Sequence, residues 1–310
     1  MRYPIGACHS NQFCPWEPKL TQTKRKAILL AGGTGSRLMP VTRAISKQLL
    51  PIYNKPMVYY PLTTLMLSDL RDIAIITTPE QQSSFANLIG DGAQWGLNIE
   101  YIAQPEPEGI SQAYILAEAF LDGHPSCLIL GDNLFFGADL PKQLSRANQG
   151  QTASVFATHV RNPEAYGVVE FRGERPIKIV EKPQEFISNY AVTGLYYLPS
   201  DAPDRARQLS KSARGEYEIT DLLNGYIEDE ALSVEKLGRG YAWLDTGTHA
   251  ALLDAGNFVR TLEDRQGLQV GSPDEIALQK GWISTEDFEA RIDLHGKSSY
   301  GAYLKSVVKN

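Results

Sequence analysis

The stretch KAILLAGGTGSRLMP, residues 26–40, decides the fold class of this chain. It opens with the short apolar run KAILLA, which has the length and composition of a buried strand, and it continues into Gly32, Gly33 and Gly35. Glycine has no Cβ atom, so the backbone N–H groups of the loop can approach phosphates closely and φ can be positive. A buried strand followed by such a loop predicts an α/β protein that binds a phosphorylated ligand.

The glycine loop differs from two common phosphate-binding motifs. No Gly-Lys-Ser/Thr sequence closes it, which excludes a Walker A loop. Leu38 stands where the third glycine of a dinucleotide fingerprint belongs, and no acidic residue follows about 20 positions later to hold a ribose. Arg37 and Lys47 are present instead. Cations beside a glycine loop suit a triphosphate, because its negative charge must be neutralised as a bond breaks.

Helix and strand patterns alternate after the loop. The predicted helices cover 57–70, 79–89 and 109–121. The predicted strands cover 72–77, 97–104 and 126–133. This alternation predicts a parallel, doubly wound sheet with helices on both faces.

The second half of the chain has a different organisation. Four strand patterns follow one another without long helices between them, at 153–160, 167–173, 177–183 and 192–199. We interpret them as a β-rich insertion that extends the sheet. Helical patterns then dominate, at 248–263, 273–279, from a capped start at Ser284, and at 301–308. We expect an irregular extension over 1–24, a core over 25–248, and a helical segment over 249–310 packed on that core.

The composition excludes several classes of protein. Of the 310 residues, 43% are apolar and 21% are charged, which is typical of a globular protein and not of a disordered one. No apolar run approaches the ~20 residues that span a bilayer, and the first residues lack the apolar core of a signal peptide. Three cysteines fit a reducing cytoplasm, and a net charge of −6 argues against nucleic-acid binding. We therefore expect a cytoplasmic protein with no membrane or nucleic-acid partner.

The basic residues are concentrated near the glycine loop. Residues 18–68 contain no Asp or Glu, although the whole chain has 36 of them. The same stretch holds eight Lys and Arg residues, so we expect an anion to bind there. Near the N-terminus, Cys8, His9 and Cys14 could ligate zinc, but no second pair of ligands follows at finger spacing.

Several polar residues stand where a phosphate-binding site would need them. Lys47 offers a compact charge for a phosphate, and Gln48 offers both a donor and an acceptor for a base or a ribose. Asp132 ends an apolar strand, where it could hold Mg²⁺ or form an Asx turn. Asp245 also ends a strand, and it could share that metal or cap the helix expected after it. Lys182 could hold a second phosphate and Glu181 could accept hydrogen bonds from sugar hydroxyls, or the two could form a surface ion pair.

In order along the chain, the motifs LAGGTGSRL, SKQLLPIYNKPM, LGDNLFFG, YGVVEF, EKP, NYAVTGLYY, RGEYEITD and GRGYAWLDTGTH resemble those of the glucose-1-phosphate thymidylyltransferases. The resemblance extends from about Lys26 to the C-terminus. It implies a Rossmann-like nucleotidyltransferase fold: a mixed central sheet flanked by helices, a β-rich sugar-binding insertion and a helical C-terminal part. It also implies that dTTP and glucose 1-phosphate react, with Mg²⁺, to give dTDP-glucose and pyrophosphate, the first step toward dTDP-rhamnose and related deoxysugars. Members without C-terminal β-helix repeats assemble as homotetramers, and a dTDP-sugar can act as a feedback ligand at a subunit interface.

The resemblance also implies a role for individual residues. The residues expected to line the nucleotide pocket are Leu30, Gly32, Gly33, Gln48, Gln104 and Gly109. The residues expected around the sugar phosphate are Gly167, Glu181, Lys182, Val192, Tyr196 and Arg214. Arg37, Lys47 and Lys182 are the expected catalytic cations, and Asp132 and Asp245 are the expected metal ligands.

Three other functions remain open at this point. A uridylyl- or cytidylyltransferase would have the same fold and the same cations. A nicotinamide-dependent oxidoreductase is disfavoured by the imperfect glycine fingerprint. A sensor of nucleotide sugars without catalytic activity is disfavoured because both cations and both aspartates are present.

Overall fold

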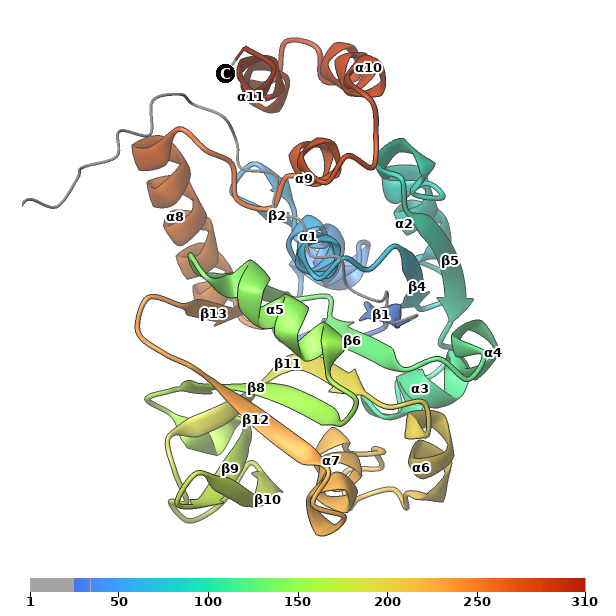
Figure 1. The fold of residues 1–310 in the computed structure, drawn as a ribbon, viewed down its shortest axis with the longest axis vertical. Helices are drawn as coiled ribbons and strands as arrows, with labels where there is room; N and C mark the ends of the chain where they lie inside the picture. Colours follow the sequence, from blue (N-terminus) through green and yellow to red (C-terminus); the bar gives the residue numbers. More distant parts are fainter. Residues whose placement is uncertain (1–24, 34, 310) are drawn as a thin grey trace, which may run out of the picture.

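The computed structural model describes residues 25–33 and 35–309. The expected extension over 1–24 lies outside the described residues, and so do Cys8, His9 and Cys14. The fold is a mixed α/β sandwich built on one large sheet, whose strands run in the order β10-β9-β11-β6-β1-β4-β5 (Figure 1). Strand β8 pairs with β11, and β12 pairs with β8.

Most strands of the large sheet lie close to their predicted bounds, whereas β12 and the β2–β3 pair were not predicted. The large sheet contains β1 (Lys26–Leu30), β4 (Asp72–Thr77), β5 (Asn98–Ala103), β6 (Ser126–Leu130), β8 (Ala153–His159), β9 (Gly167–Arg172), β10 (Arg175–Glu181), β11 (Tyr190–Leu198) and β12 (Leu232–Leu237). Two small antiparallel pairs accompany it, β2 (Pro51–Ile52) with β3 (Lys55–Pro56) and β7 (Asn133–Phe136) with β13 (Ala242–Asp245).

The first strand lies in the middle of the sheet. Ala27 pairs with Ile73 of β4 on one side and with Cys127 of β6 on the other, and both pairings are parallel. The parallel sheet predicted from the alternation is therefore correct for β5, β4, β1 and β6. Strand β11 joins β6 in the antiparallel direction, with Leu195 opposite Ile129. The complete sheet is mixed, as the family resemblance implies.

Helices cover both faces of the sheet. They are α1 (Tyr59–Leu67), α2 (Gln82–Ile89), α3 (Gln112–Leu116), α4 (Glu118–Leu121), α5 (Leu140–Gln149), α6 (Ala202–Gln208), α7 (Ile219–Glu228), α8 (His249–Gln266), α9 (Pro273–Gln279), α10 (Thr285–His295) and α11 (Ser299–Val307). Side chains alternate between the two faces of a strand. Ala27 and Leu29 therefore join a core with α1, α2, α5 and the C-terminal helices, while Ile28 joins a core with α3, α6 and α7.

Two predicted elements are divided in the structure. The helix expected over 109–121 is two short helices, because the chain leaves helical geometry at Ala117, where φ is −88° and ψ is 3°. The strand expected over 126–133 ends at Leu130, and β7 begins at Asn133. Gly131 lies between them against the backbone of β1: a Cβ atom there would lie 2.9 Å from Leu30 O. This close crossing turns the chain and directs Asp132 out of the sheet.

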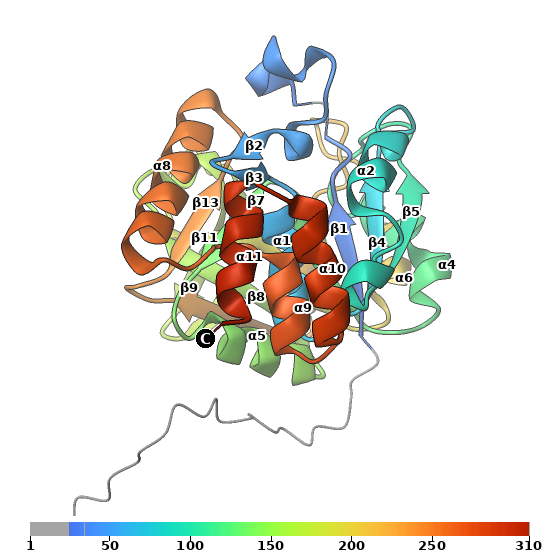
Figure 2. The same ribbon diagram turned by 90° about the horizontal axis from the view of Figure 1, so that it is seen from above.

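The C-terminal helices share the core of the sheet. Figure 2 shows α9, α10 and α11 gathered over α1, and Phe288, Ile292 and Leu304 belong to the same apolar cluster as the first strand. The boundary predicted after residue 248 stays a prediction. Within the described parts of the chain, no helix combines the length and apolar character that crossing a membrane requires.

A buried carboxylate anchors these helices. Asp274, which is fully buried, accepts hydrogen bonds from Trp95 Nε1 (3.0 Å), Arg291 Nε (2.6 Å) and Tyr300 OH (2.8 Å). Burial alone would raise the pKa of Asp274, but His295, Arg291 and Trp95 together hold it at about 2. The carboxylate therefore stays ionised and fixes α9, α10 and α11 to the body of the protein.

A second buried charge connects α8 to the β2–β3 hairpin. Lys55 of β3 is 3% exposed, and its ammonium lies 2.8 Å from the Glu263 carboxylate of α8. Burial lowers the pKa of Lys55, and the Glu263 carboxylate opposes this effect. An unpaired buried ammonium would destabilise the fold, so Lys55 must stay close to Glu263. The ion pair therefore holds the β2–β3 hairpin against α8.

Candidate functional site

A cavity opens at the carboxyl ends of β1 and β6. Its volume is ≈ 390 Å³, and it lies where open α/β sheets bind their ligands. Eleven of the residues singled out in the sequence line it: Leu30, Gly33, Arg37, Lys47, Gln48, Asp132, Gly167, Glu181, Val192, Tyr196 and Asp245. The structure thus brings together residues from the glycine loop, from the end of β6, from the β-rich insertion and from β13.

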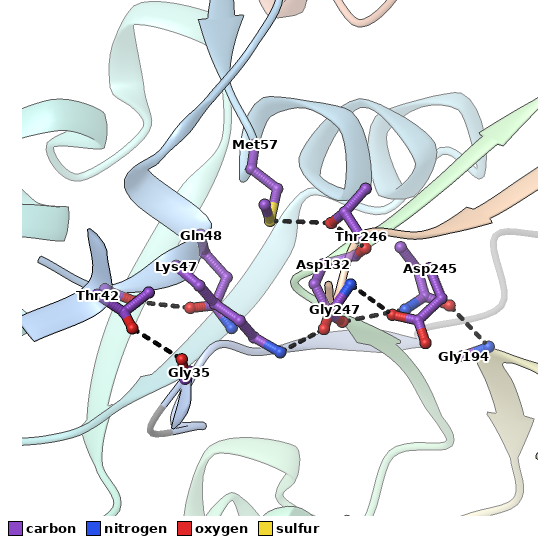
Figure 3. A network of polar contacts seen from close by, with 12 residues as sticks. Gly35, Thr42, Lys47, Gln48, Met57, Asp132, Gly194, Asp245, Thr246 and Gly247 are labelled. Carbon is purple, nitrogen blue, oxygen red and sulfur yellow. Dashed lines mark hydrogen bonds and ion pairs between the residues drawn. The ribbon is translucent and has the colours of Figure 1, made fainter. Parts of the chain in front are cut away.

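Asp132 lies at the centre of a polar network in this cavity. Its carboxylate contacts Lys47 Nζ and accepts a hydrogen bond from Asn133 Nδ2 at 3.0 Å (Figure 3). Burial would raise the pKa of Asp132, but the charge of Lys47 and the donated hydrogen bonds hold it below its usual value. The backbone of Asp132 is also fixed, because Thr246 Oγ1 donates to its carbonyl at 2.8 Å. Asp132 is therefore an ionised carboxylate in a fixed position.

Asp245, the last residue of β13, belongs to the same network although it is distant from Asp132 in the sequence. It pairs with Asn133 in the β7–β13 ribbon, which places its side chain beside Asp132 (Figure 3). Burial raises the pKa of Asp245, and the Asp132 charge raises it further, while Arg37 and Lys47 oppose this effect. Two carboxylates that repel one another in a shared cavity could together hold a cation. No group of three or more His, Cys, Asp or Glu side chains with metal-binding geometry occurs in 25–33 and 35–309.

The helix cap suggested for Asp245 is wrong. Thr248 is the N-cap residue of α8, and its Oγ1 accepts a hydrogen bond from Ala251 N at 3.2 Å. Asp245 instead accepts from Gly247 N, at 3.0 Å, within the turn that precedes the helix. The capping function therefore belongs to Thr248, and Asp245 lines the cavity.

Replacing Thr248 by Ala should lower the free energy of unfolding by about 1 kcal/mol, the usual cost of losing an N-cap. Chemical denaturation of the variant measures this loss. Thr261→Ala is a matched control, because Thr261 is exposed in the interior of the same helix and bonds only to Asn257 O. An equal loss in both variants would contradict the assignment of the cap.

Arg37 extends over the entrance from a turn of 3₁₀ helix, Ser36–Leu38. This turn begins at Gly35, whose φ is 63°, a conformation that favours glycine. A Cβ atom on Gly247 would lie 2.7 Å from Arg37 Nη2 and 3.1 Å from Asp245 Oδ1. Gly247 thus leaves the space in which the guanidinium lies beside the second carboxylate.

The β-rich insertion forms the opposite wall. Glu181, the last residue of β10, pairs with Gly167, the first residue of β9, and a Cβ atom on Gly167 would lie 3.3 Å from Glu181 Oε2. Burial raises the pKa of Glu181, although Arg214 and Lys182 oppose this effect. A glycine opposite a recessed carboxylate leaves room for a ligand rich in hydroxyl groups, which could donate hydrogen bonds to it.

Lys182 and Arg214 lie beside the cavity rather than in its lining. Lys182 has a φ of 44°, and its Nζ lies 3.8 Å from Glu181 Oε1. Arg214 is paired with three carboxylates, those of Glu218 (2.6 Å), Glu216 (3.3 Å) and Glu181 (3.3 Å). The position of Arg214 is therefore fixed by acidic neighbours, and the expectation that it contacts the sugar phosphate stays a prediction.

The lining of the cavity does not include three residues expected in the nucleotide pocket, Gly32, Gln104 and Gly109. Gln104 follows β5 and is 2% exposed, and a Cβ atom on Gly32 would lie only 1.9 Å from its Oε1. Gly109 has a φ of 106°, and its Cα faces the backbone of Tyr217. The structure brings Gly32 and Gln104 together, but none of the three residues lines the cavity.

Sequence reasoning missed the role of Asn133 and Trp243. Asn133 donates to Asp132, and its Oδ1 accepts hydrogen bonds from Gly194 N (3.1 Å) and Trp243 Nε1 (2.6 Å). One amide of β7 thereby connects β11 and β13 behind the two carboxylates. Asn133 directly follows Asp132 in LGDN, and Trp243 stands two positions before Asp245 in WLDTGT; this closeness in sequence was the available signal.

Comparison with known proteins agrees with this geometry. The profile of the family described as "Nucleotidyl transferase" matches residues 26–261. The chain therefore belongs to the nucleotidyl transferase family, a class of α/β enzymes that the fold and the charged cavity also indicate.

The relatives place the chain more narrowly within this family. It is 53% identical to the glucose-1-phosphate thymidylyltransferase of Xanthomonas campestris pv. campestris (strain B100), over 93% of this chain and 98% of that protein. It is 50% identical to the enzyme of the same name from Neisseria meningitidis, over 92% and 99% of the two chains. A solved Bacillus anthracis structure, provisionally named a glucose-1-phosphate thymidylyltransferase and in complex with a sucrose, is 38% identical with a TM-score of 0.71, over 76% of this chain and 95% of that one. The chain is a member of the glucose-1-phosphate thymidylyltransferase branch.

Proposed function

We propose that the chain joins dTTP to α-D-glucose 1-phosphate, with dTDP-glucose and pyrophosphate as the products. The observation that carries this proposal is the composition of one cavity. Two cations on the side of the glycine loop, Arg37 and Lys47, face two carboxylates, Asp132 and Asp245, and Glu181 stands at the opposite wall. The cations suit a nucleoside triphosphate, the two aspartates suit a divalent cation, and Glu181 suits the hydroxyl groups of a sugar phosphate. The names of the relatives support the same reaction.

The chemistry requires charge compensation more than proton transfer. An oxygen of the sugar phosphate attacks the α-phosphorus, the new O–P bond forms, and the bond to the β-phosphate oxygen breaks, so its electron pair leaves with pyrophosphate. The second pKa of a phosphate monoester is about 6, so the nucleophile is already mostly ionised at neutral pH. A general base is unnecessary, which is consistent with a cavity whose described lining contains no histidine.

The cations of the chain bring the two polyanions together. Arg37 and Lys47 lie on the side of the glycine loop, where the triphosphate would bind, and Lys182 lies beside Glu181, where the sugar phosphate would bind. Fixed positive charges offset the repulsion between the substrates and hold them for an in-line reaction.

The two aspartates fit a magnesium ion. Mg²⁺ prefers a few carboxylate oxygens together with phosphate oxygens and waters, and the cavity offers two adjacent carboxylates that repel one another. Asp132 and Asp245 would hold the ion, and when bound it would neutralise negative charge on the phosphates. Lys47 would then keep its contact with Asp132 or turn to the triphosphate.

An assay of pyrophosphate release tests the proposed function. The enzyme is mixed with each of several nucleoside triphosphates and sugar 1-phosphates, and released pyrophosphate is measured. We expect the highest kcat/KM with dTTP and glucose 1-phosphate. Pyrophosphate release only with UTP or CTP would assign another nucleotidyltransferase activity, and binding of dTDP-glucose without turnover would indicate a sensor.

Replacing Lys182 by Ala should raise the KM for glucose 1-phosphate, with a smaller effect on kcat. The reason is that its charge would attract the acceptor phosphate in the ground state and in the transition state alike. Lys178→Ala is the matched control, because Lys178 is an exposed lysine of β10, the strand that ends directly before Lys182, and it does not line the cavity. A change confined to the KM for dTTP would assign Lys182 to the other substrate.

We further propose the assembly and setting that the family resemblance implies. The chain forms a homotetramer in the cytoplasm and supplies dTDP-glucose for dTDP-rhamnose or a related deoxysugar. A dTDP-sugar would give feedback at a subunit interface. Light scattering of the purified protein tests the tetramer, and titration of the assay with dTDP-sugars tests the feedback.

A further inference from the structure

The Asp132 carboxylate has a partner on each of its oxygens. Lys47 Nζ contacts Oδ2, and Asn133 Nδ2 donates to Oδ1 at 3.0 Å (Figure 3). The side chains of Lys47 and Asp132 are only 14% and 11% exposed, so water and salt screen their attraction weakly. A divalent ion and the Lys47 ammonium are both cations, so they would compete for the same carboxylate.

The charges at this end of the cavity also balance one another. Even with both carboxylates ionised, the two negative charges of Asp132 and Asp245 meet the two positive charges of Arg37 and Lys47. A divalent ion is attracted by a net negative charge, and these four side chains supply none while Lys47 stays paired. A triphosphate bound at the glycine loop would add several negative charges and reverse this balance.

Of the two members of the ion pair, Lys47 is the one that can move. The backbone of Asp132 is held, because Thr246 N and Oγ1 both donate to its carbonyl, at 3.1 and 2.8 Å. Among residues 25–33 and 35–309, Asp132 is the only hydrogen-bond or ion-pair partner of the Lys47 ammonium, which is carried on a flexible four-carbon stem. A Cβ atom on Gly33 would lie 3.9 Å from Lys47 Nζ. The ammonium therefore already lies beside the glycine loop and can turn to a phosphate there.

We infer that Lys47 is a removable counter-ion of Asp132, which prevents a divalent cation from binding the two aspartates tightly unless a triphosphate is bound. This inference rests on the proposed function, in which the glycine loop binds a triphosphate and Asp132 and Asp245 hold the ion. The phosphates attract Lys47 away from Asp132, and the carboxylate is then available to the cation. The binding of metal and the binding of nucleotide are thereby coupled through one lysine.

The first test measures Mn²⁺ binding to the full chain without nucleotide, by electron paramagnetic resonance of the Mn²⁺ that stays free in solution. We expect Lys47→Met to bind Mn²⁺ roughly 10- to 100-fold more tightly than the wild type, because a positive charge beside the carboxylate is removed. Lys47→Gln gives a second measurement if methionine impairs folding. Asp132→Asn combined with Lys47→Met should lose this gain, which locates the ion at Asp132.

The second test measures dTTP binding to the same proteins by calorimetry in the presence of EDTA. Here we expect Lys47→Met to bind about 10-fold more weakly, because a charged donor to the phosphates is lost. A lysine shared between the two ligands changes the two affinities in opposite directions, whereas general damage to the site would weaken both. Arg43→Met is the matched control, since Arg43 is an exposed cation of the same basic stretch outside the cavity lining, and it should change neither affinity appreciably.

The outcomes separate this inference from the proposed function. An unchanged or weaker Mn²⁺ affinity in both Lys47→Met and Lys47→Gln would overturn the inference, and so would a gain that persists after Asp132→Asn. A wild-type enzyme that makes no dTDP-glucose would overturn the proposed function instead. The Mn²⁺ measurement requires no turnover, so it decides the inference in either case.

Discussion

Replacing Asp132 or Asp245 by Asn should lower metal-dependent turnover by about 10²-fold or more, and the double variant should be little worse than either single one. Each substitution keeps the size of the side chain and removes one negative charge. If both carboxylates hold the same ion, losing either one removes most of its binding, so the second loss has little left to remove. Activity measured against Mg²⁺ concentration in the wild type and the three variants decides the question.

The stability of these variants provides an internal check. Burial and the charge of Asp132 raise the pKa of Asp245, so Asp245→Asn should leave the free energy of unfolding unchanged or slightly increased. Asp132→Asn removes the ion-pair partner of Lys47, so it should lower the free energy of unfolding. Asp254→Asn, at an exposed aspartate of α8, is the control for the substitution itself. Additive losses of activity, or a normal Mg²⁺ requirement in Asp245→Asn, would leave Asp132 as the only protein ligand.

Replacing Arg37 by Ala should lower kcat by about 10²–10³-fold, or roughly 3–4 kcal/mol of transition-state stabilisation. The guanidinium lies over Gly247 beside Asp245, and it should matter most as negative charge builds on the departing pyrophosphate. The KM for glucose 1-phosphate should change much less, because in the proposed function the acceptor would bind at the opposite wall. Steady-state kinetics with each substrate varied in turn measures both effects.

The control for Arg37 lies in the next turn of the chain. Arg43 ends the 3₁₀ turn Val41–Arg43, is exposed, and does not line the cavity. Arg43→Ala changes the net charge of the basic stretch by the same amount, so it should leave kcat nearly unchanged. An equal decrease in both variants would show that the stretch acts by its total charge, and an unchanged kcat in Arg37→Ala would show that Arg37 is surface charge only.

The elements that could be predicted from the sequence are those with a complete local pattern. DIAIIT became β4 with the predicted bounds, and α9 begins at Pro273 and ends at Gln279 as expected, with proline in its first turn. Helix α5 was missed because only Leu140, Leu144 and Ala147 of its mostly polar residues reach the core. With so few apolar positions, the sequence pattern of α5 looks the same as that of a surface loop. Only the position of the sheet shows that these residues form a helix that covers it.

The site was partly predictable for a similar reason. A glycine loop and an aspartate at the end of a strand are local features, and both lie in the cavity as expected. The pairing of Asp245 with Asn133 depends on the assembled sheet, and no local pattern defines the register between two distant strands. The three acidic partners of Arg214 were partly visible in RGEYE, where Glu216 and Glu218 follow the arginine at short spacing.

The β7–β13 ribbon determines at what stage of folding the site comes into existence. The hydrogen bond from Trp243 to Asn133 joins residues 110 positions apart, whereas the glycine loop and Lys47 lie close together in the chain. Closing so long a loop costs entropy before its contacts can form, and distant pairings of this kind are slow. Strand β1 also pairs with a distant strand, β6, so the phosphate loop and both carboxylates depend on long-range pairings within the sheet. Nucleotide binding and turnover should therefore return together, and slowly, as the whole sheet folds.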